Sequence, residues 1–173
     1  MSRSEHSMSK RSTVTVRQQP VTPVTSVTGA LNVRSETFTI QTDARIDVRD
    51  VTDRVLALVR QLGVTEGLVN VFSMHTTCTV LINEFQAALL SDITTFLEHA
   101  VARDDAWKHN DPNHSDCDRQ NADAHQRVLL LGHSVTLQVS GGEVVLGQWQ
   151  RVLMAELDGP RARSLRIQIF GIS

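Results

Sequence analysis

The sequence lacks the features that mark several large classes of protein. Its 173 residues contain no apolar run near the roughly 20 residues needed to cross a bilayer, and no apolar core of a secretory signal. Its two cysteines, Cys78 and Cys117, are too few for a disulfide framework and do not form a close zinc-binding pair. The formal net charge of -2 gives no basis for binding nucleic acid or a membrane surface. These absences predict a cytoplasmic protein that binds neither.

What is present indicates one folded domain behind an N-terminal segment of different composition. The length fits a single domain, and 40% hydrophobic residues are enough to build a core. Residues 1–33 are rich in Ser, Thr, Val, Gln, Arg and Pro without a helical period, and Pro20 and Pro23 prevent a stable amphipathic helix. We expect a disordered extension at 1–33, with a targeting segment as the alternative, and a single domain at 34–173.

Apolar periodicity predicts an α+β fold with a compact mixed or antiparallel sheet. The expected elements are a strand at 37–41, a helix capped by Asp50 and ended by Gly63, strands at 68–74 and 79–82, a helix with Leu89, Ile93, Phe96 and Ala100 on its buried side, a helix from Asn121 to Leu131, and strands at 135–139, 144–157 and 165–169. This order does not fit a parallel doubly wound sheet, and no phosphate-binding glycine loop or internal repeat is present. Residues 101–120 have no periodicity, which is typical of a functional or mobile loop.

Three histidines lie where their side chains can converge on one pocket. His75 follows an apolar strand, His109 lies in the long loop, and His125 points to the core side of its helix with Val128 and Leu129. Three neutral imidazoles can bind one divalent metal ion, zinc or magnesium, and an open fourth position would make that metal catalytic. The alternative for each is an ordinary hydrogen-bonding histidine.

Carboxylates at the ends or edges of predicted elements are candidates for acid–base chemistry. Glu84, beside Asn83, ends a strand at what we expect to be the same end of the sheet as His75. Alternatively, its charge stabilises the helix that follows through the helix dipole. Asp92, at the edge of the apolar stripe of its helix, is a second candidate catalytic residue.

Several polar residues are candidates for substrate binding, among them Asn83 and Asn121. Residues 147–150 form a strand-like segment in which Trp149 and Gln150 alternate, so only one of them can face a pocket unless Gly147 makes a bulge. A core tryptophan is the alternative. Arg161, which follows Asp-Gly-Pro, is either a turn residue or a clamp for phosphate.

Four motifs in order resemble the secondary thiamine-phosphate synthase family, also called YjbQ-like proteins. They are HTTCTVLINE at 75–84, NADAHQRVLLLG at 121–132, LGQWQ at 146–150 and ELDGPR at 156–161. The resemblance runs from about Thr37 to Phe170 and implies a compact α+β fold, a homotrimer and a metal-capable histidine site. Cys78 and the Phe85-Gln86 pair depart from the usual family pattern, which bears on substrate preference.

The resemblance also implies an activity. Thiamine-phosphate synthase joins a hydroxymethylpyrimidine diphosphate to a thiazole phosphate and releases pyrophosphate, so the expected substrate is a small phosphorylated compound. Such a reaction needs a divalent cation and positive groups around the leaving diphosphate, and Arg161, Arg163 and a metal at the histidines are the candidates. Two alternatives remain, a metal-dependent hydrolase of a small compound and a non-catalytic trimeric binding protein. An open metal position beside Glu84 would favour an enzyme, and a closed four-ligand site would favour a structural metal.

Overall fold

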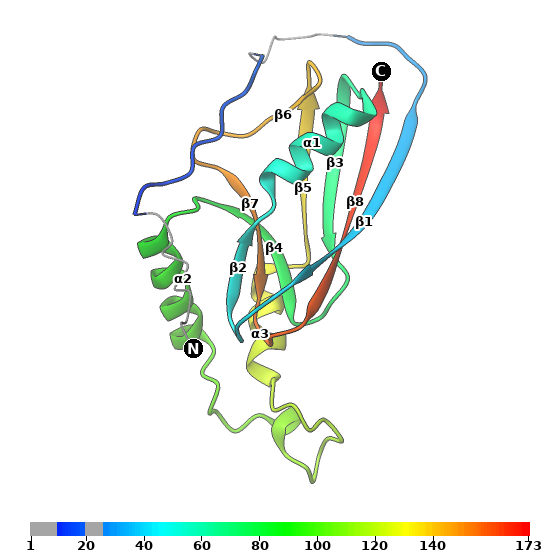
Figure 1. Cartoon of the computed structure of the whole chain (residues 1–173). Helices are drawn as coiled ribbons and strands as arrows, with labels where there is room; N and C mark the ends of the chain where they lie inside the picture. Colours follow the sequence, from blue (N-terminus) through cyan, green and yellow to red (C-terminus); the bar gives the residue numbers. More distant parts are fainter. Residues whose placement is uncertain (1–9, 20–25) are drawn as a thin grey trace, which may run out of the picture.

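The computed structural model describes residues 10–19 and 26–173, and its strands form two antiparallel sheets (Figure 1). The five-stranded sheet has the order β1 (Asn32–Gln41), β8 (Ala162–Ile172), β3 (Glu66–Ser73), β5 (Ser134–Ser140) and β6 (Glu143–Val144). The three-stranded sheet has the order β2 (Asp47–Asp50), β7 (Arg151–Glu156) and β4 (Cys78–Asn83). Every strand pairing is antiparallel. The α+β prediction is confirmed.

The helices are α1 (Thr52–Leu62), α2 (Ala87–Ala100), α3 (Ala122–Leu131) and the short 3-10 helix η1 (Lys108–Asn110). In α1, Val55 and Val59 lie one turn apart and are fully buried, as amphipathic spacing predicts. The helix ends where Gly63 adopts a left-handed φ of 65°, a conformation that glycine reaches without strain. In the described part of the chain, no helix is long and apolar enough to cross a membrane.

Two hydrophobic clusters fill the fold, and β7 contributes to both. Its side chains alternate: Val152 and Met154 pack between the two sheets together with α1, whereas Ala155 packs with α2 and α3 on the opposite face. All six residues of β7 are buried, so this strand forms the centre of the fold. A charged residue at the end of such a strand therefore needs a partner.

The buried face of α2 differs from the prediction. Phe96 is 67% exposed, while Leu90 and Leu97 are the buried residues of this helix. Ile93 packs, as expected, against the cluster that contains Ala155 and residues of α3. Apolar residues occupy so much of the circumference of α2 that its sequence is compatible with two stripes, and packing in the cluster that α2 shares with α3 and β7 selects one of them.

The single strand expected at 144–157 is also wrong. Residues 147–150 form a turn, in which the amide of Gln150 donates to the carbonyl of Gly147 at 3.0 Å. The side-chain oxygen of Gln150 accepts from the amide of Gly147 at 2.8 Å, which completes the turn. Trp149 is consequently 49% exposed and is not a core tryptophan.

Part of the predicted disordered extension contacts the domain. The amide of Thr15 donates to the carbonyl of Gln148 at 2.8 Å, and that of Thr13 donates to the carbonyl of Phe85 at 3.2 Å. Thr15 is buried, so the prediction of a disordered extension is wrong for residues 10–19. Residues 26–33 are described as well, and β1 already begins at Asn32, two residues before the predicted start of the domain. Residues 1–9 and 20–25 lie outside the described residues.

Candidate functional site

Polar and charged side chains gather at one end of the three-stranded sheet. There β7 ends, β8 begins, α3 begins and the loop of residues 101–120 returns to the domain (Figure 1). The first residue of β4, Cys78, pairs with Glu156 at the end of β7, so His75 and Thr77 lie at this end as well. Segments far apart in the sequence thus form one site.

A buried ion pair forms the base of the site. Glu156 is fully buried and Arg163 is only 2% exposed. The Nε and Nη2 groups of Arg163 both donate to the Glu156 carboxylate, and Nη2 also donates to Thr77 Oγ1 at 2.8 Å. This bidentate geometry offsets the cost of burying two charges. Arg163 is buried and its donors are directed to Glu156 and Thr77, so it positions these two groups, and its role in substrate binding stays a prediction.

Asp158 is the centre of a second, more open network. Its carboxylate accepts from Arg119 Nε and from Asn121 Nδ2, each at 2.8 Å, and from Arg45 Nη1 at 3.2 Å. Arg161 Nη1 lies 3.8 Å away. Burial acts to raise the pKa of Asp158, but the hydrogen bonds from Arg119 and Asn121 outweigh it and leave this pKa below its usual value. Asp158 is therefore a charged anchor for the surrounding arginines.

Asp123, in the first turn of α3, extends this network. Arg45 Nη2 donates to both of its carboxylate oxygens, at 2.8 and 3.1 Å, and Arg127 Nη1 lies 3.3 Å from one of them. Arg45 thus bridges Asp123 and Asp158. The expected cap residue Asn121 makes no side-chain cap bond to α3: its Nδ2 donates to Asp158, and its Oδ1 accepts from the thiol of Cys117 at 3.7 Å. The beginning of α3 is held by these charged groups instead.

The structure brings two of the three predicted histidines together. The rings of His109 and His125 meet edge to face with centroids 5.0 Å apart. Burial, followed by the proximity of His109, lowers the pKa of His125, so this ring is neutral near pH 7. His75 lies elsewhere in the site: its Nε2 accepts from the amide of Ser164 at 2.8 Å. Burial, followed by the charge of Arg163, lowers the pKa of His75.

These residues do not fit a metal ion that one chain binds by itself. Within residues 10–19 and 26–173, no three His, Cys, Asp or Glu side chains are grouped as metal ligands would be. His75 directs Nε2 to a backbone amide, whereas His109 and His125 face each other. The predicted three-histidine centre is thus not formed within a single chain.

The predicted acid–base residue Glu84 lies far from the histidines. Asn83 pairs with Arg151 at the opposite end of β4 from Cys78, and Glu84 follows Asn83. A strand of six residues separates the two ends by roughly 17–20 Å. The expectation that Glu84 and His75 share one end of the sheet is therefore wrong, and Glu84 instead contacts Ser12 of the N-terminal segment.

Three other predicted residues also lie outside the site. Trp149 and Gln150 belong to the turn that precedes Arg151, at the same end as Asn83. Asp92 is exposed on α2. The catalytic and substrate-binding roles suggested for these residues remain predictions without support from a contact in the site.

Several residues of the site were missed by sequence reasoning. Asp158 lies within the ELDGPR motif, and this position could have drawn attention to it. Arg45, Arg119 and Asp123 carry no local signal, because only long-range packing brings the loops and α3 together. Of the predicted residues, His75, His109, Asn121, His125, Arg161 and Arg163 do lie at this end of the sheet.

Known proteins resemble this chain over nearly the whole domain. A family model described as UPF0047 protein YjbQ-like matches residues 36–172. A UPF0047 protein of Methanothermobacter thermautotrophicus is 38% identical over 141 residues, which cover 82% of this chain and 94% of that protein. A UPF0047 protein of Archaeoglobus fulgidus is 39% identical over 131 residues, which cover 76% and 97%.

Solved structures also match this chain over most of its length. The crystal structure of a YbjQ-like protein of unknown function from Sulfolobus solfataricus matches with a TM-score of 0.77 and 30% identity, covering 82% of this chain and 99% of that one. A hypothetical protein from Aeropyrum pernix matches with a TM-score of 0.73 and 36% identity, covering 80% and 98%. Sequence and fold lead to the same conclusion: the chain belongs to the YjbQ-like family of UPF0047 proteins.

Proposed function

We propose that this chain is an enzyme that binds a small phosphorylated compound at the arginines around Asp158 and acts at its phosphorylated end. One observation carries the proposal: in the linked ion-pair network, guanidinium groups outnumber carboxylates by four to two. The arginines are Arg45, Arg119, Arg127 and Arg161, and the carboxylates are Asp123 and Asp158. Asp118 also acts electrostatically on Arg119, which brings the balance to four guanidinium groups and three carboxylates, and the remaining positive charge favours an anion.

Two of these arginines also have donor groups available to an anion. Asp158 is 1% exposed, whereas the side chains of Arg119 and Arg161 are 42% and 33% exposed. Each guanidinium group is therefore close to a buried carboxylate and still has N–H groups available to solvent. Planar guanidinium forks match the oxygens of phosphate, and donors that are already oriented stabilise charge that develops on a leaving diphosphate.

The two neighbouring histidines supply groups for proton transfer. His125 is neutral near pH 7 because burial lowers its pKa, and a neutral imidazole can accept a proton. His109 contacts it edge to face and can share that role. In the proposed mechanism, Arg119 and Arg161 bind phosphate, and His125 would accept a proton from attacking water in the hydrolytic alternative.

We propose thiamine-phosphate synthesis as the reaction. The resemblance of the four sequence motifs to the secondary thiamine-phosphate synthases supports this choice. The thiazole nitrogen forms a bond to the methylene carbon of the pyrimidine, and the bond from that carbon to the diphosphate oxygen breaks without release of a proton. Pyrophosphate leaves with the electron pair, so negative charge builds on it. Arg119 and Arg161 are the groups that would stabilise this charge.

The test compares Arg161→Ala with Arg166→Ala. Arg166 is an exposed arginine of β8 that bonds Ser35 and Thr37, away from the site, so its loss controls for the loss of one charge. With both substrates and Mg²⁺, we expect Arg161→Ala to lower kcat/KM for thiamine phosphate by about 10²-fold. Arg166→Ala should retain the wild-type value.

A calorimetric titration with pyrophosphate separates the alternatives. Pyrophosphate binding without synthesis would redirect the proposal to hydrolysis or to a non-catalytic binding protein, and phosphate release from small phosphate esters would identify hydrolysis. If the wild-type protein neither forms product nor binds pyrophosphate, the proposal is wrong as a whole.

We also propose that the chain forms a homotrimer, as the resemblance implies. Exposed apolar side chains support an interface: Phe72 and Met74 at the end of β3, and Leu129 and Leu130 near the end of α3. The amide of Ser73 donates to the carbonyl of His133 at 2.8 Å, which links these two regions. Light scattering should give three times the chain mass of 19.2 kDa, and Leu129→Asp should lower it. A single-chain mass for the wild type would contradict the proposal.

A further inference from the structure

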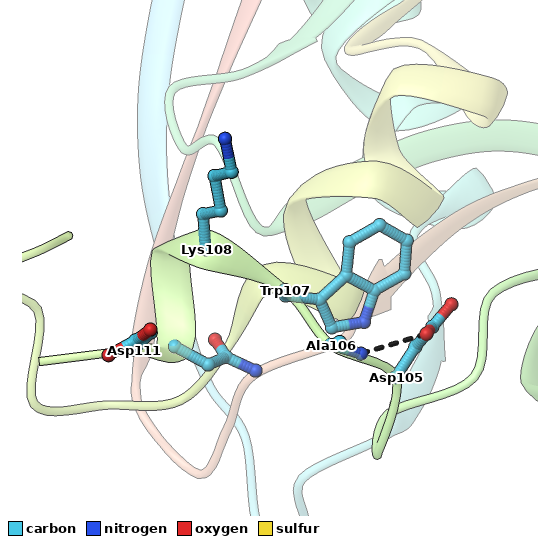
Figure 2. Close-up of a pocket in the computed structure, with 6 residues that line it drawn as sticks. Asp105, Ala106, Trp107, Lys108 and Asp111 are labelled. Carbon is cyan, nitrogen blue, oxygen red and sulfur yellow. Dashed lines mark hydrogen bonds between the residues drawn. The ribbon is translucent and has the colours of Figure 1, made fainter. Parts of the chain in front are cut away.

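A hollow in the loop of residues 101–120 has chemistry that the proposed reaction has not used. Its volume is about 270 Å³, and its lining residues are Asp105, Ala106, Trp107, Lys108, Asn110 and Asp111 (Figure 2). All of them belong to η1 or the residues beside it. The indole of Trp107 stands beside Asp105, with Lys108 and Asp111 further along the chain.

Trp107 gives the hollow a fixed aromatic wall. Its Nε1 donates to the carbonyl of Ala102 at 2.9 Å, which satisfies the polar atom of the indole and fixes the ring. The side chain of Trp107 is only half-buried. A held and partly open indole is a surface on which another planar ring can stack.

Charged groups that line the hollow select what can bind there. Asp105 and Asp111 provide carboxylates, and Lys108 provides the one cation. Asp111 is engaged by His114 and Asn113. Among residues 10–19 and 26–173, the one hydrogen bond to the Asp105 side chain comes from the amide of Ala106, at 2.8 Å. The second oxygen of Asp105 therefore remains available as an acceptor. Such a wall favours a ring that carries a hydrogen-bond donor.

The hollow adjoins the histidine pair through η1. His109 lies between Lys108 and Asn110 in this helix and contacts His125. The side chain of Asn110 accepts from the amide of Ala122, the first residue of α3, at 3.0 Å. One short helix thus lines the hollow and presents a histidine to the arginine site.

We propose that this hollow binds a planar heteroaromatic ring that carries an amino group, stacked on Trp107 with the amino group donating to Asp105. The inference rests on the proposed function, because the ring is taken to be part of the substrate whose phosphate meets Arg119 and Arg161. It names the chemistry of that part, a nitrogen heterocycle with an exocyclic amine.

Tryptophan fluorescence tests this directly. The chain has two tryptophans and no tyrosine, so Trp149→Phe leaves Trp107 as the only strong fluorophore. Titration of this variant with 4-aminopyrimidine should give saturable quenching. Pyrimidine, which lacks the amino group, should bind at least about fivefold more weakly because it loses a hydrogen bond to a charged acceptor.

Two aspartate variants, each made in the Trp149→Phe background, localise the effect. Asp105→Asn keeps the shape and the bond to Ala106 but removes the charge, so it should abolish most of the preference for 4-aminopyrimidine. Asp116→Asn is the matched control, because Asp116 is an exposed aspartate of the same loop that does not line the hollow. It should bind both compounds like the parent variant.

The outcomes separate this inference from the proposed function. Absence of saturable quenching, equal binding of the two compounds, or equal effects of the two aspartate variants would overturn the inference. Pyrophosphate binding measured by calorimetry should survive Asp105→Asn, whereas Arg161→Ala should weaken it and leave 4-aminopyrimidine binding intact. Ring binding without pyrophosphate binding would remove the proposed function and, with it, the assignment of the ring to a phosphorylated substrate.

Discussion

Replacing Glu156 by Gln tests the buried ion pair at the base of the site. Gln keeps the size of the side chain and one oxygen that can accept from the amide of Asp158, now 2.8 Å from the carboxylate. It removes the negative charge and turns an NH₂ group toward donors of Arg163. Because Arg163 is 2% exposed, its charge would be left in the interior without compensation.

The expected cost is large. Removing one partner of a buried pair typically costs about 3–5 kcal/mol. Little discount for solvent applies here, since both Glu156 and Arg163 are buried. For a domain of this size, each kcal/mol lowers Tm by roughly 2–4 °C, so the variant should melt about 10 °C below the wild type.

Denaturant unfolding at fixed protein concentration gives the free energy. Glu36→Gln is the control, because Glu36 pairs with Arg54 and both side chains are exposed; its cost should stay within about 0.5 kcal/mol. In the double variant Glu156→Gln with Arg163→Met, no uncompensated charge remains, so its free energy of unfolding should exceed that of Glu156→Gln by at least about 1 kcal/mol. A loss below about 1 kcal/mol in Glu156→Gln would refute the reasoning.

Two further predictions concern the histidines and the cysteines. Burial lowers the pKa of His125 in the folded state below the value of about 6.5 that it has in the unfolded chain. At pH values just below 6.5 the unfolded chain therefore binds more protons than the folded one, and stability must rise with pH in that range. Tm measured from pH 5 to 7.5 should depend less on pH in His125→Asn, and an unchanged slope would contradict this. Cys78 is fully buried and burial raises its pKa to about 11, whereas Cys117 is only partly buried, so a thiol reagent should titrate one cysteine in the native protein and two after unfolding. Two equivalents in the native protein would show that Cys78 is accessible.

Elements with strong local signals could be predicted from the sequence. The apolar spacing of α1 and the stop at Gly63 both follow from short-range chemistry, and both are present in the structure. The turn at 147–150 was missed because the residues on either side are apolar enough to suggest one continuous strand. In α2, the sequence permits two buried stripes, and long-range packing in the cluster shared with α3 and β7 decides that Leu97 is buried and Phe96 exposed.

The site could be predicted only in part, for a related reason. His125 and Arg161 stand in motifs with a recognisable spacing, and both lie at the site. Glu84 carried an equally strong local signal, but strand pairing places it at the other end of β4. Arg45 and Arg119 come from loops, and their contacts with Asp158 depend on how distant segments pack. Long-range pairing, which single-sequence patterns do not encode, separates the correct predictions from the wrong ones.

The docked N-terminal segment affects how this protein should be prepared. The family match begins at residue 36, and a gene trimmed to that boundary would omit Thr15. The hydroxyl of Thr15 donates to the carbonyl of Gln150 at 2.8 Å and accepts from the buried Arg151 at 3.3 Å. The shortened protein would remove this partner of Arg151 and open a polar gap beside β7. A C-terminal tag on a chain that keeps residues 10–19 leaves that contact undisturbed.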